Sequence, residues 1–293
     1  MTCIKKMEFN RYHSPFGHEE LMAKCRKIKH VALDMDGTIY LGSKLFPFTL
    51  GFLKDLEEMG IKYSFLTNNP TKSVADYLLK IEKLGIKATP EEMYTSSVAA
   101  IDYLRDKMPE ARKLYVVGTP SMEEEFRNAG FELMPDDPGQ KPDCLVVAFD
   151  TTLTYPKLCH ASWLAAEGIP YIATNPDRVC PTDLKTVLVD CGSLCACIEH
   201  ATGRRPDAVI GKPNPDMLSG ICFREGLKPE EVAMCGDRIY TDVATARNAG
   251  SLGVLVLSGE TTLETAMKSD PQPDITAESI AEFCELLKEA RKE

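Results

Sequence analysis

The sequence predicts an α/β protein in which a core built on a parallel sheet carries an inserted second α/β segment. Short apolar runs typical of buried strands alternate with amphipathic runs typical of helices, which is the pattern of parallel strands joined by crossover helices. Polar residues stand where these apolar runs end, beginning with Asp34 and Asp36. The alternation begins again between about 106 and 206 without a second pair of aspartates, so we expect this stretch to be a cap domain over the site of the core.

Composition and charge limit the classes of function. The chain has 293 residues, a length typical of about two domains, and its 44% hydrophobic and 27% charged residues are typical of a globular protein in water. A formal net charge of −10 argues against nucleic acid and anionic membranes as partners. No apolar run reaches the length of a transmembrane helix, and the basic N-terminus lacks the apolar stretch of a secretory signal. Eleven scattered cysteines, an odd number, favour a reducing compartment, and we therefore expect a cytoplasmic protein.

The first part of the expected core, residues 1–106, begins with an extension and continues as two strand–helix pairs. Residues 1–28 are polar, with helical potential around 19–27, and nothing in them indicates a role. The apolar run before Asp34 predicts a buried strand. Further elements of this part are expected as a helix over 49–59, a strand over 62–66, a helix that Asn69 caps and that ends near 84, and a helix over 98–107.

The cap is expected over residues 107–206, and the core is expected to resume over 207–293. In the cap we expect strands over 113–117, 144–149 and 171–174 and helices over 121–129 and 156–167. In the second part of the core we expect strands over 207–210, 232–235 and 254–257 and helices over 215–225, 243–248 and 277–291.

Two aspartates at the end of the first strand indicate a cation site. Asp34 and Asp36 are one residue apart, and side chains at i and i+2 on extended backbone point to the same side. Gly37 permits the tight turn that would hold both carboxylates toward one cleft. Because such carboxylates repel each other, a divalent cation between them is expected, and hard oxygen ligands favour Mg²⁺. Asp and Gly after a strand are also ordinary turn residues, so this motif alone would not decide the matter.

Three further strand ends carry polar residues, and the carboxyl ends of parallel strands are where ligands bind in such a sheet. The four motifs in order are DMDGT at 34–38, LTNN at 66–69, GKP at 211–213 and GDRIYTD at 236–242. In identity, order and strand placement they resemble the four motifs of the haloacid dehalogenase-like (HAD) hydrolases. The resemblance covers about Val31 to Gly259, and the N-terminal extension departs from it. It implies a Rossmann-like core with helices on both faces, and an enzyme that hydrolyses phosphate esters.

The resemblance assigns chemical roles to the motif residues. Asp34 would be the nucleophile that forms an aspartyl-phosphate, and Asp36 would be the general acid and then the general base. Magnesium would be held by Asp34, by the backbone carbonyl of Asp36 and by Asp237, while Asp242 would orient metal-bound water. Thr67 and the backbone N–H of Asn68 would bind the transferring phosphoryl oxygens, and Lys212 would neutralise their charge.

The cap indicates a branch of this family. An α/β insertion of this size between Thr67 and Lys212 resembles the cap of the NagD-like or p-nitrophenylphosphatase enzymes, and LTNNP, ATNPDRVCP and VIGKPNP look similar to that branch as well. In such enzymes a cap loop contacts the leaving group. We therefore expect a substrate-selectivity segment from Asn175 to Pro181, with Asn175, Asp177 and Arg178 as its polar residues. Arg178 could pair with an anionic substituent or simply be a solvated arginine.

These expectations amount to a Mg²⁺-dependent phosphomonoesterase with a mobile cap. The expected substrates are small phosphorylated metabolites, such as sugar phosphates or nucleoside monophosphates, with p-nitrophenyl phosphate as a surrogate. Two alternatives stay open: a phosphomutase or phosphotransferase on the same fold, and a non-catalytic protein that binds phosphorylated metabolites. The sequence does not fix the physiological substrate or the oligomeric state, and a homodimer is kept as a possible assembly.

Overall fold

The structure of this chain is a computed structural model that describes residues 11–180 and 186–292. The chain forms two compact units, one made of residues 1–64 and 225–293 and the other of residues 65–224. No helix in the described part of the chain is long and apolar enough to cross a membrane. The predicted boundaries of the cap, 107 and 206, stay a prediction.

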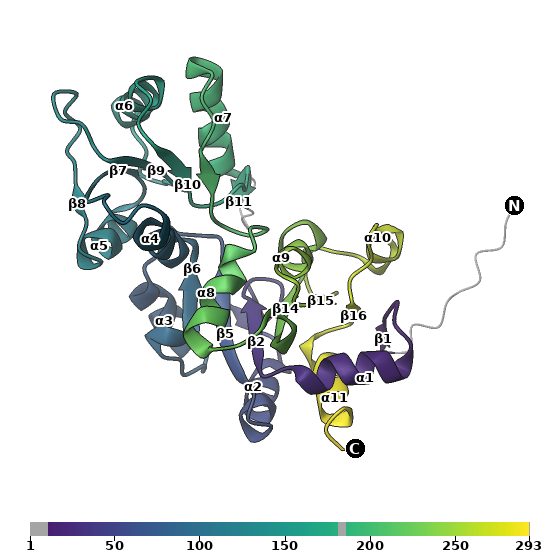
Figure 1. Cartoon of the computed structure of the whole chain (residues 1–293). Helices are drawn as coiled ribbons and strands as arrows, with labels where there is room; N and C mark the ends of the chain where they lie inside the picture. The colour runs from purple at the N-terminus through teal and green to yellow at the C-terminus, as the bar shows by residue number, and fades with distance from the viewer. Residues whose placement is uncertain (1–10, 181–185, 293) are drawn as a thin grey trace, which may run out of the picture. The chain divides into compact units, whose positions relative to one another are not determined.

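A seven-stranded sheet runs through the predicted core (Figure 1). Its hydrogen-bonded order is β1 (Tyr12–His13), β16 (Ile275–Ala277), β15 (Leu252–Val256), β14 (Val232–Gly236), β2 (His30–Asp34), β5 (Lys62–Thr67) and β6 (Met93–Thr95). Strands β2, β14, β15 and β16 pair in parallel, as do β5 and β6, whereas β1 is antiparallel to β16. Every residue of β14 and β15 is buried, which is expected where helices cover both faces of a parallel sheet. The predicted α/β class is confirmed.

In the described residues of the first unit there are five helices, and they lie on both faces of its strands. They are α1 (His18–Lys27), α2 (Thr49–Glu58), α9 (Ala244–Ala249), α10 (Leu263–Lys268) and α11 (Ile280–Glu289). Helix α11 packs beside α1 and α2, while α9 packs against β14 and β15. The last helix begins at Ile280 rather than near 277, because Ser279 caps it and the residues before it form β16.

Residues 11–28 of the N-terminal extension are an integral part of this unit. Helix α1 buries Leu21, Met22 and Cys25, and it lies beside α11. The Arg291 guanidinium, at the C-terminal end of the chain, donates to the carbonyl oxygens of Cys25 and Ile28 at 3.2 and 2.5 Å. The described part of the extension is therefore attached to the C-terminal segment through α11 and Arg291. Its polar sequence did not indicate this structural role.

The second unit contains a separate five-stranded parallel sheet. Its order is β13 (Ala208–Val209), β10 (Tyr171–Ala173), β9 (Cys144–Val147), β7 (Lys113–Val117) and β8 (Glu132–Leu133). Helices α6 (Tyr155–Ala166) and α7 (Cys191–Thr202) lie on one face, and α5 (Pro120–Asn128) lies on the other (Figure 1). The strand expected over 207–210 does not resume the core sheet. It pairs in parallel with β10 and forms the edge of this second sheet.

The remaining elements connect these sheets. Two short hairpins are formed by β3 (Tyr40–Leu41) with β4 (Lys44–Leu45) and by β11 (Val179–Cys180) with β12 (Leu188–Val189). The other helices and helical turns are α3 (Val74–Lys83), α4 (Ser96–Lys107), α8 (Asp216–Glu225), η1 (Pro90–Glu92), η2 (Pro229–Glu231) and the π-helical turn η3 (Ile239–Val243).

One predicted helix cap is wrong. Helix α3 begins after Ser73, whose hydroxyl accepts from the N–H of Asp76 while the Asp76 carboxylate accepts from the N–H of Ser73. The Asn69 carboxamide instead accepts from the N–H of Thr71 at 2.9 Å and closes a local turn. A reciprocal capping box satisfies two helix N–H groups, so it defines the start of the helix better than a single asparagine does.

Candidate active site

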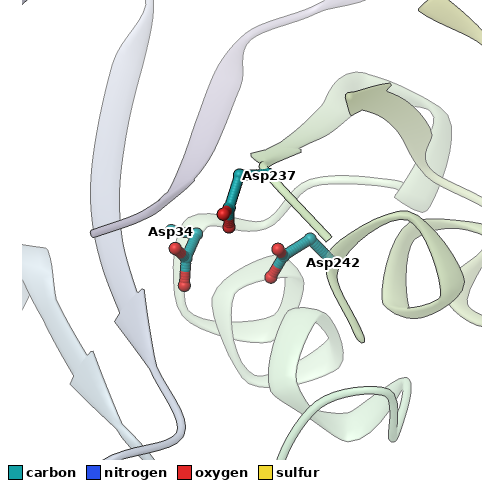
Figure 2. Close-up of side chains that lie close together, drawn as sticks. All are labelled: Asp34, Asp237 and Asp242. Atoms are coloured by element: carbon teal, nitrogen blue, oxygen red, sulfur yellow. The ribbon is translucent and has the colours of Figure 1, made fainter. Parts of the chain in front are cut away.

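Three carboxylates from two neighbouring strands form an acidic cluster in the first unit. Asp34 is the last residue of β2, Asp237 directly follows β14, and Asp242 lies in η3. Since β2 and β14 are parallel neighbours, their carboxyl ends lie together. One carboxylate oxygen from each residue lies within 4.8 Å of the others, and Figure 2 shows the three side chains lying close together.

The cluster is buried enough for its charge to matter. Asp237 is 3% exposed and Asp242 is 1% exposed, whereas Asp34 is half-buried. Carboxylates that are close together and shielded from water repel strongly, so positive charge is required if all three are to be ionised. The donors are all oxygen atoms, which is the ligand set of a hard divalent cation. No other group of three or more possible metal-ligating side chains is found among the described residues.

The backbone at two glycines beside the cluster leaves no room for a side chain. A Cβ atom at Gly236 would overlap the Asp242 carboxylate, and a Cβ atom at Gly37 would lie 2.5 Å from Asp237 Oδ2. Gly37 also has a φ of 87°, which only glycine adopts readily. The N–H of Arg238 donates to Asp242 Oδ2 at 3.1 Å. These close approaches explain why glycine stands in both sequence motifs.

Asp36 is separate from the buried cluster. Its side chain is exposed, and its Oδ1 lies 3.5 Å from the N–H of Gly42 in the β3–β4 hairpin. The turn that carries it is held by the N–H of Gly37, which donates to the carbonyl oxygen of Tyr40 at 2.7 Å. This carboxylate is therefore accessible to solvent.

The predicted phosphate-binding residues come together in the second unit. The Asn68 carboxamide pairs with both main-chain groups of Lys212: its Oδ1 accepts from the N–H at 2.7 Å and its Nδ2 donates to the carbonyl oxygen at 3.0 Å. Lys212 is only 3% exposed. Thr67 is half-buried at the end of β5, and its hydroxyl oxygen accepts from the N–H of Asn69 at 3.2 Å. Asn68 therefore fixes the backbone that carries Lys212 beside the Thr67 loop.

The predicted selectivity segment joins this network through the same asparagine. Asn68 Nδ2 also donates to Asp177 Oδ2 at 3.1 Å, and Asn175 Nδ2 donates to the carbonyl oxygen of Asn68 at 3.0 Å. Arg178 is exposed, and its carbonyl oxygen accepts from the N–H of Asp190 at 3.0 Å. Pro181, the predicted end of the segment, lies outside the described residues.

Asp190 is the titratable group with the clearest perturbation beside this segment. It is 3% exposed and caps α7, where its carboxylate accepts from the N–H of Cys191 at 2.6 Å. Burial raises the pKa of Asp190 to about 7, and the nearby charge of Asp177 acts in the same direction.

Comparisons with known proteins identify the family. The profile of the haloacid dehalogenase-like hydrolases matches residues 31–132, and a second profile, of HAD-hydrolase-like proteins, matches residues 209–283. An acid sugar phosphatase of Staphylococcus aureus is 30% identical over 257 residues, which are 88% of this chain and 97% of the relative. The chain belongs to the haloacid dehalogenase-like hydrolases.

Solved structures of the family place the chain in the NagD-like branch. A 4-nitrophenylphosphatase from Thermotoga maritima is 37% identical with a TM-score of 0.84, covering 89% of this chain and 98% of that one. NagD from Escherichia coli is 30% identical with a TM-score of 0.78, covering 87% and 97%. A glycerol phosphate phosphatase from Mycobacterium tuberculosis, solved with magnesium and also with calcium, is 25% identical in the magnesium complex, with a TM-score of 0.80 and coverage of 88% and 77%. The predicted family and branch are confirmed, and the chain is an enzyme of the hydrolase class.

The sequence missed one part of this HAD site. The loop after β15 contacts Asp237, with the N–H of Glu260 donating to Asp237 Oδ2 at 2.7 Å. Arg238 Nε lies 2.9 Å from Glu260 Oε2. Burial by itself would lower the pKa of the Arg238 guanidinium. The surrounding acidic groups, including Asp34, outweigh burial and raise this pKa above its ordinary value. The available signal was the position of this polar loop at the carboxyl end of a core strand, where the four recognised motifs also stand.

Proposed function

We propose that this HAD hydrolase is a Mg²⁺-dependent phosphomonoesterase that acts on small phosphorylated metabolites. The observation that carries this proposal is the cluster of half-buried Asp34 with buried Asp237 and Asp242, with Asp36 two residues after Asp34. The Staphylococcus aureus, Thermotoga maritima and Mycobacterium tuberculosis relatives are named as phosphatases, which supports the same reaction class.

The donor set fits Mg²⁺. Three oxygen-donating carboxylates within 4.8 Å of one another would be costly without a counter-charge, and a small hard cation supplies it. Asp34, Asp237 and the backbone carbonyl of Asp36 would hold the ion, and Asp242 would orient its water ligands. When bound, the ion supplies positive charge that stabilises the oxygens of the phosphoryl group. The magnesium complex of the glycerol phosphate phosphatase supports this choice of ion.

The chain's own residues would carry out two successive displacements. An oxygen of Asp34 attacks phosphorus and forms an aspartyl-phosphate, while the departing ester oxygen takes a proton from Asp36. Asp36, now a base, then takes a proton from the water that attacks phosphorus. Inorganic phosphate leaves and the Asp34 carboxylate is restored. The Thr67 hydroxyl, the N–H of Asn68 and the Lys212 ammonium would bind the phosphoryl oxygens in both steps.

Substrate choice would lie in the cap, which we propose spans 107–206 and closes during phosphoryl transfer. A separate sheet supports an independent cap: β7, β8, β9 and β10 lie within this range, and the edge strand β13 (Ala208–Val209) lies just after it. Asn175, Asp177 and Arg178 would contact the leaving group. The names of the relatives, an acid sugar phosphatase and a glycerol phosphate phosphatase, support small hydroxylated phosphate esters as substrates.

A release assay tests the proposal. Inorganic phosphate would be measured after incubation with p-nitrophenyl phosphate, sugar phosphates, glycerol phosphate and nucleoside monophosphates, each with Mg²⁺ and with EDTA. We expect release that depends on Mg²⁺, and the ranking of the esters would identify the substrate class. Transfer of phosphate to a second sugar without release would favour a phosphomutase. Binding of esters without either reaction would favour a non-catalytic binding protein.

The cytoplasmic location and the homodimer stay predictions. Gel filtration with light scattering would measure the mass of the assembly against the 32.5 kDa of one chain.

A further inference from the structure

A loop outside the four motifs contacts the acidic cluster through Asp237. It consists of residues 258–261 and follows β15, and we call it the clamp loop. The N–H of Glu260 donates to Asp237 Oδ2 at 2.7 Å, and the N–H of Thr261 donates to the carbonyl oxygen of Asp237 at 3.2 Å. Both the side chain and the main chain of Asp237 are therefore held by the same loop.

The approach of the clamp loop is too close for a side chain at its centre. A Cβ atom at Gly259 would lie 2.6 Å from both Cβ and Cγ of Asp237. The corresponding atom at Gly37, in the DMDGT motif, would lie 3.2 Å from the Cα of Gly259. Gly37, Asp237 and Gly259 thus interlock, and a methyl group at Gly259 would have to displace the Asp237 carboxylate.

Side chains tie the clamp loop to the segments that carry the other carboxylates. The Ser258 hydroxyl donates to the carbonyl oxygen of Gly37 at 2.6 Å. The Glu260 carboxylate lies 2.9 Å from Arg238 Nε and accepts from the Tyr240 hydroxyl at 2.8 Å. The N–H of Arg238 in turn donates to Asp242. The clamp loop is thus bonded to the turn that follows Asp34, to Asp237 itself and to the residue that binds Asp242.

We propose that Gly259 and Glu260 are positioning residues that set the orientation of the Asp237 carboxylate for Mg²⁺. The proposal rests on the proposed function, since it deepens the role of Asp237 as a metal ligand. A hydrogen bond to one oxygen of a carboxylate fixes its rotation, and partners of this kind tune metal affinity by about 10- to 100-fold. The pair of Glu260 and Arg238 is itself partly exposed, at 46% and 26%, so as an ion pair it adds little to stability. Loss of this ion pair should therefore leave the free energy of unfolding nearly unchanged, so a change in Mg²⁺ affinity would report on positioning and not on stability.

Calorimetric titration with Mg²⁺ tests the clamp loop without requiring turnover. Gly259→Ala should raise the Kd for Mg²⁺ by about 10- to 100-fold. The matched control is Gly51→Ala, because a Cβ atom at Gly51, in α2, meets nothing within 4 Å. Glu260→Gln should raise the Kd by up to about fivefold, since it removes only the charge of a partly exposed pair. Its control is Glu264→Gln, which removes the exposed pair with Lys268.

Two outcomes decide the proposal. If Gly259→Ala folds and melts near the wild-type temperature in EDTA but binds Mg²⁺ as tightly as Gly51→Ala, the proposal is overturned. If Gly259→Ala does not fold, the double variant Ser258→Ala/Glu260→Gln decides: a Kd raised at least about fivefold supports the clamp, and an unchanged Kd overturns it. A wild-type chain that binds Mg²⁺ but hydrolyses no ester would overturn the proposed function and leave this test valid.

Discussion

Replacement of Asn68 by alanine should weaken the second unit at a single point. The Asn68 carboxamide makes three hydrogen bonds, of 2.7 and 3.0 Å to the main chain of Lys212 and of 3.1 Å to Asp177. Alanine removes all three. The N–H and carbonyl groups of Lys212 then lose their bonds to Asn68 while they stay shielded from water, because Lys212 is only 3% exposed. A buried polar group that loses its partner costs about 1–3 kcal/mol. Two such groups, with some relaxation, amount to roughly 2–4 kcal/mol.

Differential scanning calorimetry measures this loss. For a unit of about 150–250 residues, each kcal/mol lowers the melting temperature by about 2–4 °C, so we expect a fall of roughly 4–16 °C in the transition of residues 65–224. The matched control is Asn69→Ala, because the Asn69 carboxamide closes a local turn with Thr71 and contacts Cys180 Sγ only at 3.8 Å. If Asn68→Ala melts at the same temperature as Asn69→Ala, Asn68 does not hold Lys212 in the way described.

Three further variants test other parts of the structure. Burial raises the pKa of Asp190 to about 7 from 3.8, so the folded state binds this proton more tightly, and its contribution to stability is fully present below about pH 4 and lost as pH rises through about 7. In urea titrations, wild type should lose roughly 3 kcal/mol more than Asp190→Asn between pH 5 and pH 8, and equal losses would contradict the assigned pKa. Arg291→Ala removes the hydrogen bonds to the carbonyl oxygens of Cys25 and Ile28 and should lower the melting temperature of the first unit. An unchanged melting curve would contradict a stabilising role for this attachment of α1. Lys157→Met leaves the fully buried Asp150 carboxylate without the ammonium at 2.9 Å, at a cost of about 3–5 kcal/mol in thermal unfolding. Adding Asp150→Asn should restore much of that stability. A double variant that unfolds as easily as Lys157→Met would show that the loss does not come from the charge of Asp150.

The sequence predicted the strand ends because local rules determine them. An apolar run followed by Asp34 needs no partner to be recognised as a buried strand end, and the spacing of Asp237 and Asp242 is equally local. The structure brings Asp34, Asp237 and Asp242 together because β2 and β14 are parallel neighbours. The roles assigned to these residues in phosphoryl transfer stay predictions.

The parts that sequence reasoning missed depend on contacts between distant segments. The clamp loop approaches Asp237 only because β15 lies beside β14, and nothing in Gly259 or Glu260 alone indicates it. The edge strand β13 continues an apolar run that fits either sheet, and pairing with β10 decided the outcome. The polar N-terminal extension gave no sign that its helix would pack on α11.

The most direct test of the proposed mechanism is phosphate release by wild type and by Asp34→Asn, with p-nitrophenyl phosphate in the presence of Mg²⁺ and in EDTA. Asparagine keeps the shape of the side chain but lacks the negative charge and nucleophilicity of the carboxylate, so it cannot form the aspartyl-phosphate. We expect release by wild type with Mg²⁺, none in EDTA, and none by a correctly folded Asp34→Asn. Comparable release by Asp34→Asn, or release by wild type that EDTA does not diminish, would contradict the claim that Asp34 is the nucleophile of a metal-dependent phosphatase.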